Sequence, residues 1–241
     1  MKIKLLGKNL DDIRPLLREL GFEESDRGFE LIVTHGGDGA LLGAEREFPG
    51  VPKLPLRDAA TARPCPAHDA RKRLEKFLAE RPEPVRLPKL SGSFEGHVIY
   101  GINDVFLHRA LPTSALRYRV RIDGEPYGDE IVGDGVGLSS VHGSTAYYRS
   151  ITHSIFRVGV GLSFSNSTEE VDHMVLDSES TVSIKVTRGP AVLVADNTPH
   201  GIEVAENGVV TMCQTKEYAL VFDLDGFMCP ACRELRHHRR N

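Results

Sequence analysis

Residues 29–42, FELIVTHGGDGALL, place an apolar run, three glycines and an aspartate ahead of a group of helix-forming residues. The run from Phe29 to Thr34 shows no alternation of polar and apolar positions, which is typical of a parallel strand covered on both faces. Residues Ala40 to Glu47 then predict a short helix. The stretch therefore predicts a strand–turn–helix unit of a parallel α/β sheet, with an acidic residue in the turn.

The segments on either side of this unit belong to the same structural class. Residues 3–6 and 51–56 predict two further strands, and residues 10–20 predict a helix because their leucines and isoleucine recur at helical spacing. Residues 70–80 group Leu74, Phe77 and Leu78 on one face of a second helix. We therefore expect a Rossmann-like α/β domain over residues 1–90.

The pattern changes after residue 90. Residues 97–110, 116–127 and 180–189 alternate between polar and apolar positions and are separated by Asp-Gly and Arg-Gly turn signals, which is typical of antiparallel strands. We expect a β-sandwich domain over residues 91–225. Residues 226–241 are expected to form a C-terminal tail, and whether it returns to the first domain stays open.

Composition excludes several classes of function. The 241 residues carry a net charge of -4, which gives no global attraction to nucleic acid or to an anionic membrane. The basic residues 233–241 are interpreted as a solvated tail. No apolar run approaches the roughly 20 residues of a membrane-spanning helix, and the N-terminus has too short an apolar centre for a signal peptide. Four cysteines do not make a disulfide framework in a chain of this length, so we expect a cytoplasmic protein.

The glycine-rich turn predicts phosphate chemistry. Gly36, Gly37 and Gly39 would let backbone amides approach a phosphate at the start of a helix. Because an aspartate there repels a bare phosphate, Asp38 would either bind Mg²⁺ or accept a proton from an attacking hydroxyl. The alternative is a tight turn in which Asp38 only caps the following helix. A P-loop is not indicated, since no GxxxxGK[ST] sequence is present.

A second region, residues 133–150, is rich in glycines and hydroxyl side chains. Its serine and threonine hydroxyls and backbone amides are suited to hydrogen-bonding a ribose or an adenine edge. Tyr147 or Tyr148 would be placed to stack on a base. The same composition also fits an ordinary β-turn of a sandwich, and both interpretations stay open from the residues alone.

Taken together, the motifs form an ordered set. GGDG at residues 36–39 is followed by INDVFLHRA at 102–110, by GDG at 133–135 and by GSTAY at 143–147. This order resembles the NAD kinase family. The resemblance implies a Rossmann-like domain followed by a β-sandwich, a divalent cation such as Mg²⁺, and transfer of a phosphoryl group from ATP to the adenosine-ribose 2′-hydroxyl of NAD, giving NADP. It also implies a homodimer or homotetramer.

The resemblance assigns roles to individual residues. Asp38 matches the family's catalytic aspartate, and Gly36, Gly37 and Gly39 match its phosphate-facing turn. The residues that match the dinucleotide-binding positions are Asn103, Asp104, Asp134, Thr145, Ala146, Tyr147 and Ser150.

Departures from the family pattern concern the substrate more than the fold. Ala40 stands where the family usually has a threonine, and residues 51–65 replace its usual GxNxGxLGF stretch. His142 and residues 148–159 also differ. Two alternatives therefore accompany the kinase interpretation: a nucleotide-binding homologue without catalysis, and a kinase for another small hydroxyl compound.

Two short Cys/His pairs have the spacing of metal ligands. Cys65 and His68 form one pair, and Cys229 and Cys232 form the other, which together would supply the four ligands of a structural zinc site. The two pairs would meet only if the C-terminal segment returns to the first domain. Free thiols and a surface histidine are the alternative.

Overall fold

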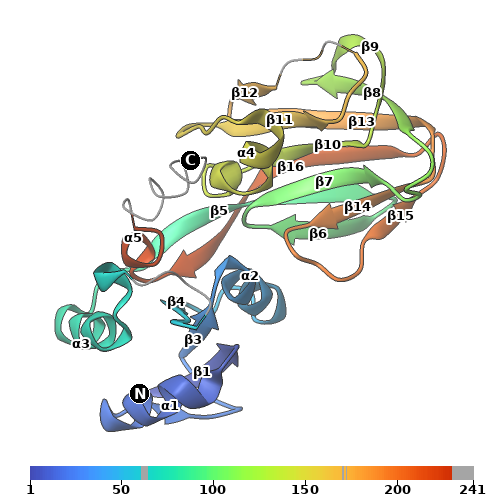
Figure 1. Cartoon of the computed structure of the whole chain (residues 1–241). Helices are drawn as coiled ribbons and strands as arrows, with labels where there is room; N and C mark the ends of the chain where they lie inside the picture. The colour runs from blue at the N-terminus through green and yellow to red at the C-terminus, as the bar shows by residue number, and fades with distance from the viewer. Residues whose placement is uncertain (61–64, 170, 172, 230–241) are drawn as a thin grey trace. The chain divides into compact units, whose positions relative to one another are not determined.

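The computed structural model describes residues 1–60, 65–169, 171 and 173–229 of the chain (Figure 1). The chain divides into two compact units, one containing Met1–Leu87 with Ala219–Asn241 and the other containing Pro88–Tyr218. The chain leaves the first unit within strand β5 and re-enters it within strand β16. Among the described residues, no helix combines the length and hydropathy needed to cross a bilayer.

The first unit is built on a parallel sheet with the strand order β2-β1-β3-β4-β16. All six residues of β3 are buried, which explains the uninterrupted apolar run in the sequence. Its elements are β1 (Lys2–Gly7), α1 (Leu10–Glu19), β2 (Glu23–Glu24), β3 (Leu31–Gly36), α2 (Asp38–Glu47), β4 (Lys53–Arg57), the 3₁₀ helix η1 (Pro66–His68), α3 (Ala70–Glu80), the end of β16 (Val209–Val221) and α5 (Leu224–Phe227).

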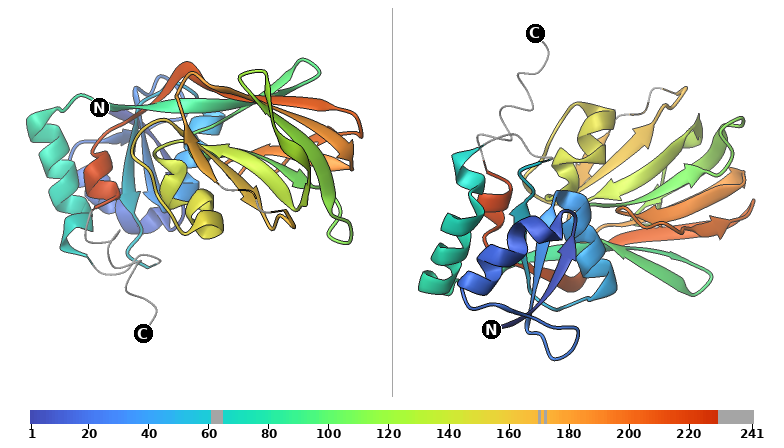
Figure 2. Two further views of the ribbon diagram at one scale, coloured as in Figure 1. Left: turned by 90° about the horizontal axis from the view of Figure 1, so that it is seen from above. Right: turned by 60° about the horizontal axis from the view of Figure 1, so that its bottom comes forward.

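Helices cover both faces of this sheet. Ile13 and Leu17 of α1 pack with Leu74 and Phe77 of α3 on alternate residues of β1, β3 and β4. Helix α2 packs against β3 and β4 and buries its own Leu41. Figure 2 shows α1 (blue) and α3 (teal) beside the strands from two further directions. The chain segments that follow β3 and β4 lie at the carboxyl ends of these two strands.

The second unit is an antiparallel β-sandwich. One sheet contains β13, β8, β9, β5, β6 and most of β16, and the other is six-stranded with the order β12-β11-β10-β7-β14-β15. The elements are β5 (Val85–Phe94), β6 (His97–Gly101), β7 (Asp104–Arg109), β8 (Leu116–Ile122), β9 (Glu125–Gly133), β10 (Gly135–Ser139), the 3₁₀ helix η2 (Gly143–Thr145), α4 (Tyr147–Thr152), β11 (Val160–Ser165), β12 (Met174–Leu176), β13 (Thr181–Arg188), β14 (Ala191–Ala195), β15 (Ile202–Val204) and β16.

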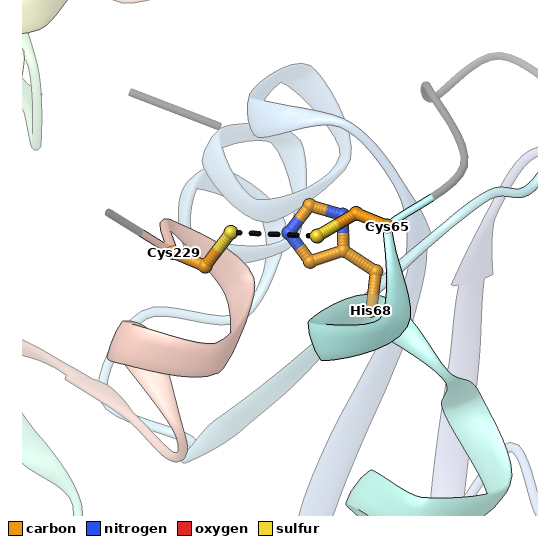
Figure 3. Close-up of side chains that lie close together, drawn as sticks. All are labelled: Cys65, His68 and Cys229. Carbon is orange, nitrogen blue, oxygen red and sulfur yellow. Dashed lines mark hydrogen bonds between the residues drawn. The ribbon is translucent and has the colours of Figure 1, made fainter. Parts of the chain in front are cut away.

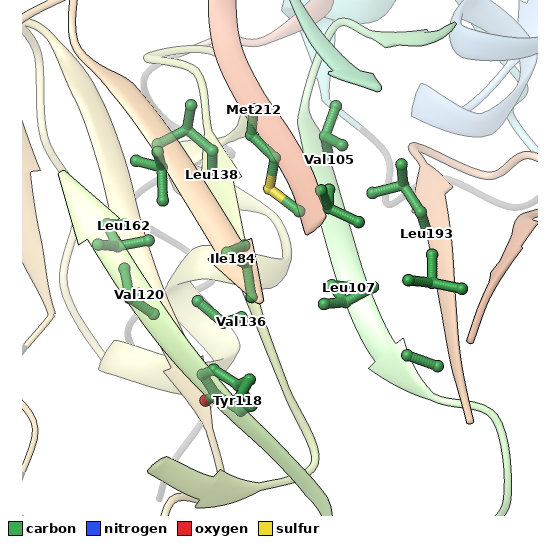
Figure 4. Close-up of a cluster of buried hydrophobic side chains, with 14 of the residues drawn as sticks. Val105, Leu107, Tyr118, Val120, Val136, Leu138, Leu162, Ile184, Leu193 and Met212 are labelled. Atoms are coloured by element: carbon green, nitrogen blue, oxygen red, sulfur yellow. The ribbon is translucent and has the colours of Figure 1, made fainter. Parts of the chain in front are cut away.

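The core of the sandwich follows the two-residue period of the strands. Val105 and Leu107 of β7 point into a buried cluster with Tyr118 and Val120 of β8 and with residues of β10, β11, β13, β14 and β16 (Figure 4). Asp104, Phe106 and His108 alternate with them and therefore lie on the opposite face of the six-stranded sheet. That outer face carries most of the polar candidates discussed below.

The fold class expected from the sequence is confirmed: a parallel α/β unit precedes an antiparallel β-sandwich. Three local features differ from the expectation. The parallel sheet gains a strand from β16, residues 97–110 form two strands that break at Ile102 and Asn103, and residues 135–139 form β10. The glycine-rich stretch around Asp134 is thus largely a strand, where its composition had indicated a loop or a β-turn.

Candidate functional site

The GGDG turn joins β3 to α2 at the carboxyl end of a central parallel strand. Gly36 closes β3 with φ of +150°, a conformation that residues with side chains rarely adopt. Gly37 is the residue before the helix, and Asp38 is its first residue. The N-cap position of α2 is occupied by Gly37, so Asp38 is not the N-cap residue of this helix. Its carboxylate lies in the first turn of a helix, where the helix dipole stabilises negative charge.

Arg57, a residue that sequence analysis missed, lies beside this carboxylate. It is the last residue of β4 and pairs with Gly36 in the sheet. Its Nη2 atom lies 3.7 Å from Oδ1 of Asp38, at the edge of an ion-pair contact. Oδ1 of Asp38 is buried and forms no hydrogen bond with any described residue. The turn therefore holds an acceptor oxygen with no hydrogen-bond donor, next to a cation.

A cavity of about 610 Å³ opens at the carboxyl ends of β3 and β4. His35 of β3, Arg57 of β4 and Asp58, which follows β4, line it together with Cys65 and with His68 of η1. Asp58 is almost fully buried and is fixed by a 2.8 Å hydrogen bond from Asn9 Nδ2 to its Oδ2. Ligands of open α/β sheets bind at this edge of the sheet. The cavity has the location and the mixed charge expected of a small-molecule site.

In the second unit, a side chain remote in sequence organises the Asn103 turn. Asp196, which follows β14, accepts hydrogen bonds from the backbone amides of Ile102, Asn103 and Asp104 at 2.8, 2.7 and 3.2 Å. Asn103 is 6% exposed, and its Oδ1 is buried without a hydrogen-bond partner among the described residues. A buried amide oxygen of this kind is a candidate acceptor for a ligand hydroxyl or amine.

Asp104 has an unusual protonation equilibrium. Burial raises the pKa of its carboxyl group to about 7, and the negative charge of Asp196 acts in the same direction. Close to neutral pH, the group therefore exchanges between an ionised acceptor and a protonated donor. Such perturbed carboxyl groups occur preferentially at functional sites.

The GSTAY segment packs directly on the Asn103 turn. Ser140 links them, since its amide donates to the Asn103 carbonyl at 2.8 Å and its Oγ both donates to the Ile102 carbonyl and accepts from the Gly143 amide. A Cβ atom at Gly143 would lie 1.9 Å from the Asn103 carbonyl oxygen. Glycine at 143 is therefore required by the close approach of the two backbones.

We expect Gly143→Ala to lower the free energy of unfolding by about 1–3 kcal/mol, because the methyl group forces the two segments apart. Urea denaturation measures this change. Gly43→Ala is the matched control: a Cβ at Gly43 meets only the flexible end of Arg46, and alanine is the better helix former. Equal stability of the two variants would contradict the packing argument.

The outer face of β7 and β10 carries an aromatic layer. Phe106 stacks on His108 with a centroid distance of 4.6 Å, and the ring of Tyr147 contacts both. Gly137 makes room for this layer, since a Cβ there would collide with the Phe106 ring at 1.9 Å. The GDGVG glycines at residues 133–137 thus serve close packing in a strand.

Asp134 lies at the far end of this layer. His108, Asp134, Tyr147 and Asn166 line a cavity of about 320 Å³. The Asp134 carboxylate accepts hydrogen bonds from Asn166 Nδ2 at 2.7 Å and pairs with Arg109 Nε at 2.8 Å. Burial lowers the pKa of His108, and the charge of Asp134 opposes this effect.

The remaining predicted positions of this region lie in η2, in α4 or between them. Thr145, Ala146 and Tyr147 are partly or fully accessible, and the hydroxyls of Thr145 and Ser150 donate to the carbonyls of His142 and Tyr147. Tyr148 is 1% exposed and packs edge-on against Phe156, so it belongs to the core and cannot stack on a base. Of the two tyrosines that sequence analysis considered, Tyr147 is the accessible one.

The candidate zinc ligands partly converge. Cys65, His68 and Cys229 lie together in the first unit, whereas Cys232 lies outside the described residues (Figure 3). Burial lowers the pKa of His68, and the positive charges of Arg57 and Arg73 act in the same direction.

Comparison with known protein families gives one model match. The ATP-NAD kinase C-terminal domain matches residues 102–224, which is slightly more than half of the chain. Among curated proteins, an NAD kinase of Saccharolobus islandicus is 27% identical over 165 residues, covering 64% of this chain and 64% of that protein. A mitochondrial NADH kinase of Saccharomyces cerevisiae is 29% identical over 137 residues, covering 52% and 33%. The chain thus matches less than two thirds of the length of these relatives.

Solved structures share the fold over nearly the whole chain. An Archaeoglobus fulgidus NAD kinase in complex with ATP superposes with a TM-score of 0.77 at 20% identity, covering 97% of this chain and 98% of that one. A yeast NADH kinase complexed with NADH gives a TM-score of 0.81 at 16% identity, covering 100% and 88%. At these identities the similarity establishes the architecture.

Proposed function

Because the chain belongs to the NAD kinase family, we propose that it transfers the γ-phosphoryl group of ATP to the adenosine-ribose 2′-hydroxyl of NAD, giving NADP. The observation that carries this proposal is the Asp38 carboxylate. It lies in a glycine turn at the carboxyl end of a parallel strand, and one of its oxygens is buried without a hydrogen-bond donor. Such an oxygen is available to accept the proton of a substrate hydroxyl.

Positioning and charge neutralisation are the main requirements of phosphoryl transfer. The amides of the turn at Gly36, Gly37 and Gly39 would face the phosphates, and Arg57 would add a positive charge beside Asp38. Asp38 would orient the ribose hydroxyl and take its proton late in the transfer. The chemistry needs no covalent intermediate on the protein.

The residues fit Mg²⁺ as a companion of ATP. The described residues contain one group of three or more Cys, His, Asp or Glu side chains that could hold a single ion, namely Cys65, His68 and Cys229. Its sulfur and nitrogen atoms do not suit Mg²⁺, which prefers oxygen ligands. Mg²⁺ typically binds through one or two carboxylates together with substrate phosphates. The phosphates of ATP would hold the ion and it would neutralise their charge, so that the Asp38 carboxylate stays available to the ribose hydroxyl.

The second unit would bind the dinucleotide along the outer face of β7. Asn103 and Asp104 lie at one end of this strand, and Asp134 lies beside its other end, since Gly135 pairs with His108. Four steps along a strand span roughly 14 Å. Candidates spread over that distance suit an elongated ligand with two riboses, with Asn103 and Asp104 at one ribose, Asp134 at the other, and Tyr147 with its neighbours at the adenine.

The test is NADP formation by the purified chain supplied with NAD, ATP and Mg²⁺, read with an NADP-specific dehydrogenase. NADH as acceptor and polyphosphate as donor are compared in parallel assays. Production of NADP or NADPH supports the proposal. If no combination of donor and acceptor gives product while calorimetry shows saturable NAD binding, the proposal is wrong. The protein is then a nucleotide-binding homologue that lacks catalysis.

A further inference from the structure

The C-terminal segment of the chain is fastened to the first unit by two arginines. Arg73 of α3 donates from Nε to Asp223 Oδ2 at 2.6 Å and from Nη2 to the Asp223 carbonyl at 3.0 Å. Arg57 donates to the Phe227 carbonyl at 3.0 Å, and its guanidinium carbon lies 3.9 Å from the centroid of the Phe227 ring. These contacts hold α5 against η1, with Cys229 just beyond α5.

This arrangement brings three metal-binding side chains together from distant parts of the sequence. Cys65 precedes η1, and His68 is its last residue. Cys229, more than 160 residues further along the chain, lies beside them (Figure 3). One ligand atom from each of the three lies within 4.8 Å of the others. The two sulfurs are 3.7 Å apart. A tetrahedral ion with metal–sulfur bonds of about 2.3 Å separates its two sulfur ligands by about 3.8 Å, so the observed distance matches that of a shared ion.

His68 supplies the second observation. Both of its ring nitrogens are buried, and neither has a hydrogen-bond partner among the described residues. A buried imidazole that lacks hydrogen-bond partners carries a desolvation cost. Coordination of an ion beside the two thiols would satisfy one nitrogen and turn this cost into a binding contribution.

We propose that Cys65, His68 and Cys229 bind a zinc ion that ties the C-terminal segment to the loop after β4. Sulfur and imidazole ligands without a carboxylate favour zinc over Mg²⁺ or Ca²⁺. The role is structural: Cys65 and His68 also line the 610 Å³ cavity, so the ion fixes one wall of that cavity.

The test uses the full chain, purified under reducing conditions, loaded with zinc and separated from loosely bound metal. Mass spectrometry of the metal should find about one zinc per chain. Cobalt substitution should give the intense visible absorption of a tetrahedral cobalt–thiolate centre. Cys65→Ser and His68→Ala should each weaken zinc binding by more than roughly 100-fold, because losing a ligand exceeds the effect of losing a second-shell contact.

Two further variants separate metal binding from folding. Cys213→Ser is the matched control, since Cys213 lies in the second unit beside Ser91, and it should bind zinc like the wild type. His68→Cys should restore binding with a stronger cobalt–thiolate absorption. Chelation should lower the Tm of the wild type and leave that of His68→Ala unchanged.

Failure of the folded wild type to retain zinc or cobalt would overturn the proposal, as would a Cys65–Cys229 disulfide in the isolated protein. Full zinc content in Cys65→Ser and His68→Ala would also overturn it. None of these readouts requires phosphoryl transfer, so the zinc site and the proposed kinase reaction stand or fall separately.

Discussion

Asp38→Asn is expected to lower kcat for NADP formation by roughly 10²- to 10⁴-fold, the range for loss of a general base. Asparagine keeps the size of the side chain but cannot take the proton of the ribose hydroxyl. The KM for NAD should change little, because all the proposed dinucleotide contacts other than that of Asp38 belong to the second unit. Steady-state kinetics of the two proteins, with matched Tm values, measures the effect.

The control for this variant is Asp129→Asn, the same chemical change at an exposed aspartate of β9. It should retain wild-type kcat and KM. If Asp38→Asn turns over within a few-fold of the wild type, Asp38 is not the base and the proposed reaction at the glycine turn is wrong.

A magnesium titration distinguishes the two roles open to Asp38. A base that is lost cannot be replaced by added metal, so kcat of Asp38→Asn should stay low at every Mg²⁺ concentration. A metal ligand that is lost weakens Mg²⁺ binding, so high Mg²⁺ should recover part of the rate. We expect the first result, because Oδ1 of Asp38 is buried without a hydrogen-bond donor among the described residues and is therefore placed to accept a proton.

Local patterns predicted the elements of the first unit well. Helix α3 occupies residues 70–80 as expected, because its apolar residues share one face and Asp69 caps it by accepting from the Lys72 amide at 2.9 Å. The strand before the GGDG turn was also predicted, since burial on both faces leaves a continuous apolar run. Periodicity and turn chemistry are local, so a single sequence contains them.

Contacts across long separations were not predictable in the same way. The pairing of Val221 with Lys53 adds β16 to the parallel sheet, and Asp196 caps the Asn103 turn from 93 residues away. Neither contact leaves a spacing signal in the sequence. Arg57 was missed for a related reason, since it reads as the end of an apolar strand until β4 is placed beside the GGDG turn.

The two tyrosines of the GSTAY region illustrate a limit of a different kind. Tyr147 and Tyr148 are neighbours in α4, and consecutive residues of a helix point about 100° apart. One therefore enters the core against Phe156 while the other faces the aromatic layer of β7. Only the placement of the helix decides which, and the sequence motif alone left both open.

Asp104→Asn is expected to change how stability depends on pH. The folded-state pKa of Asp104 is about 7, above its ordinary value of 3.8, so between these values the folded protein holds a proton that the unfolded chain releases. The stability contributed by this group is fully present below about pH 4 and is lost as pH rises through 7. The separation corresponds to about 4 kcal/mol as an upper limit.

Urea unfolding at pH 4, 5.5 and 7.5 tests this expectation. The stability of Asp104→Asn relative to the wild type should rise across the series, because asparagine carries no charge beside Asp196 at any pH. Asp129→Asn should follow the wild type throughout. Parallel curves for Asp104→Asn and the wild type would show that Asp104 titrates normally.

The protonation of Asp104 should also change the affinity for the dinucleotide. If Asp104 accepts hydrogen bonds from ribose hydroxyls, only its ionised form binds fully, so the dissociation constant for NAD should fall as pH rises through about 7. Calorimetry from pH 6 to pH 8.5 measures this dependence, and it should be absent in Asp104→Asn. A dependence of equal size in both proteins would assign the titrating group elsewhere, with His108 on the same face of the sheet as the next candidate.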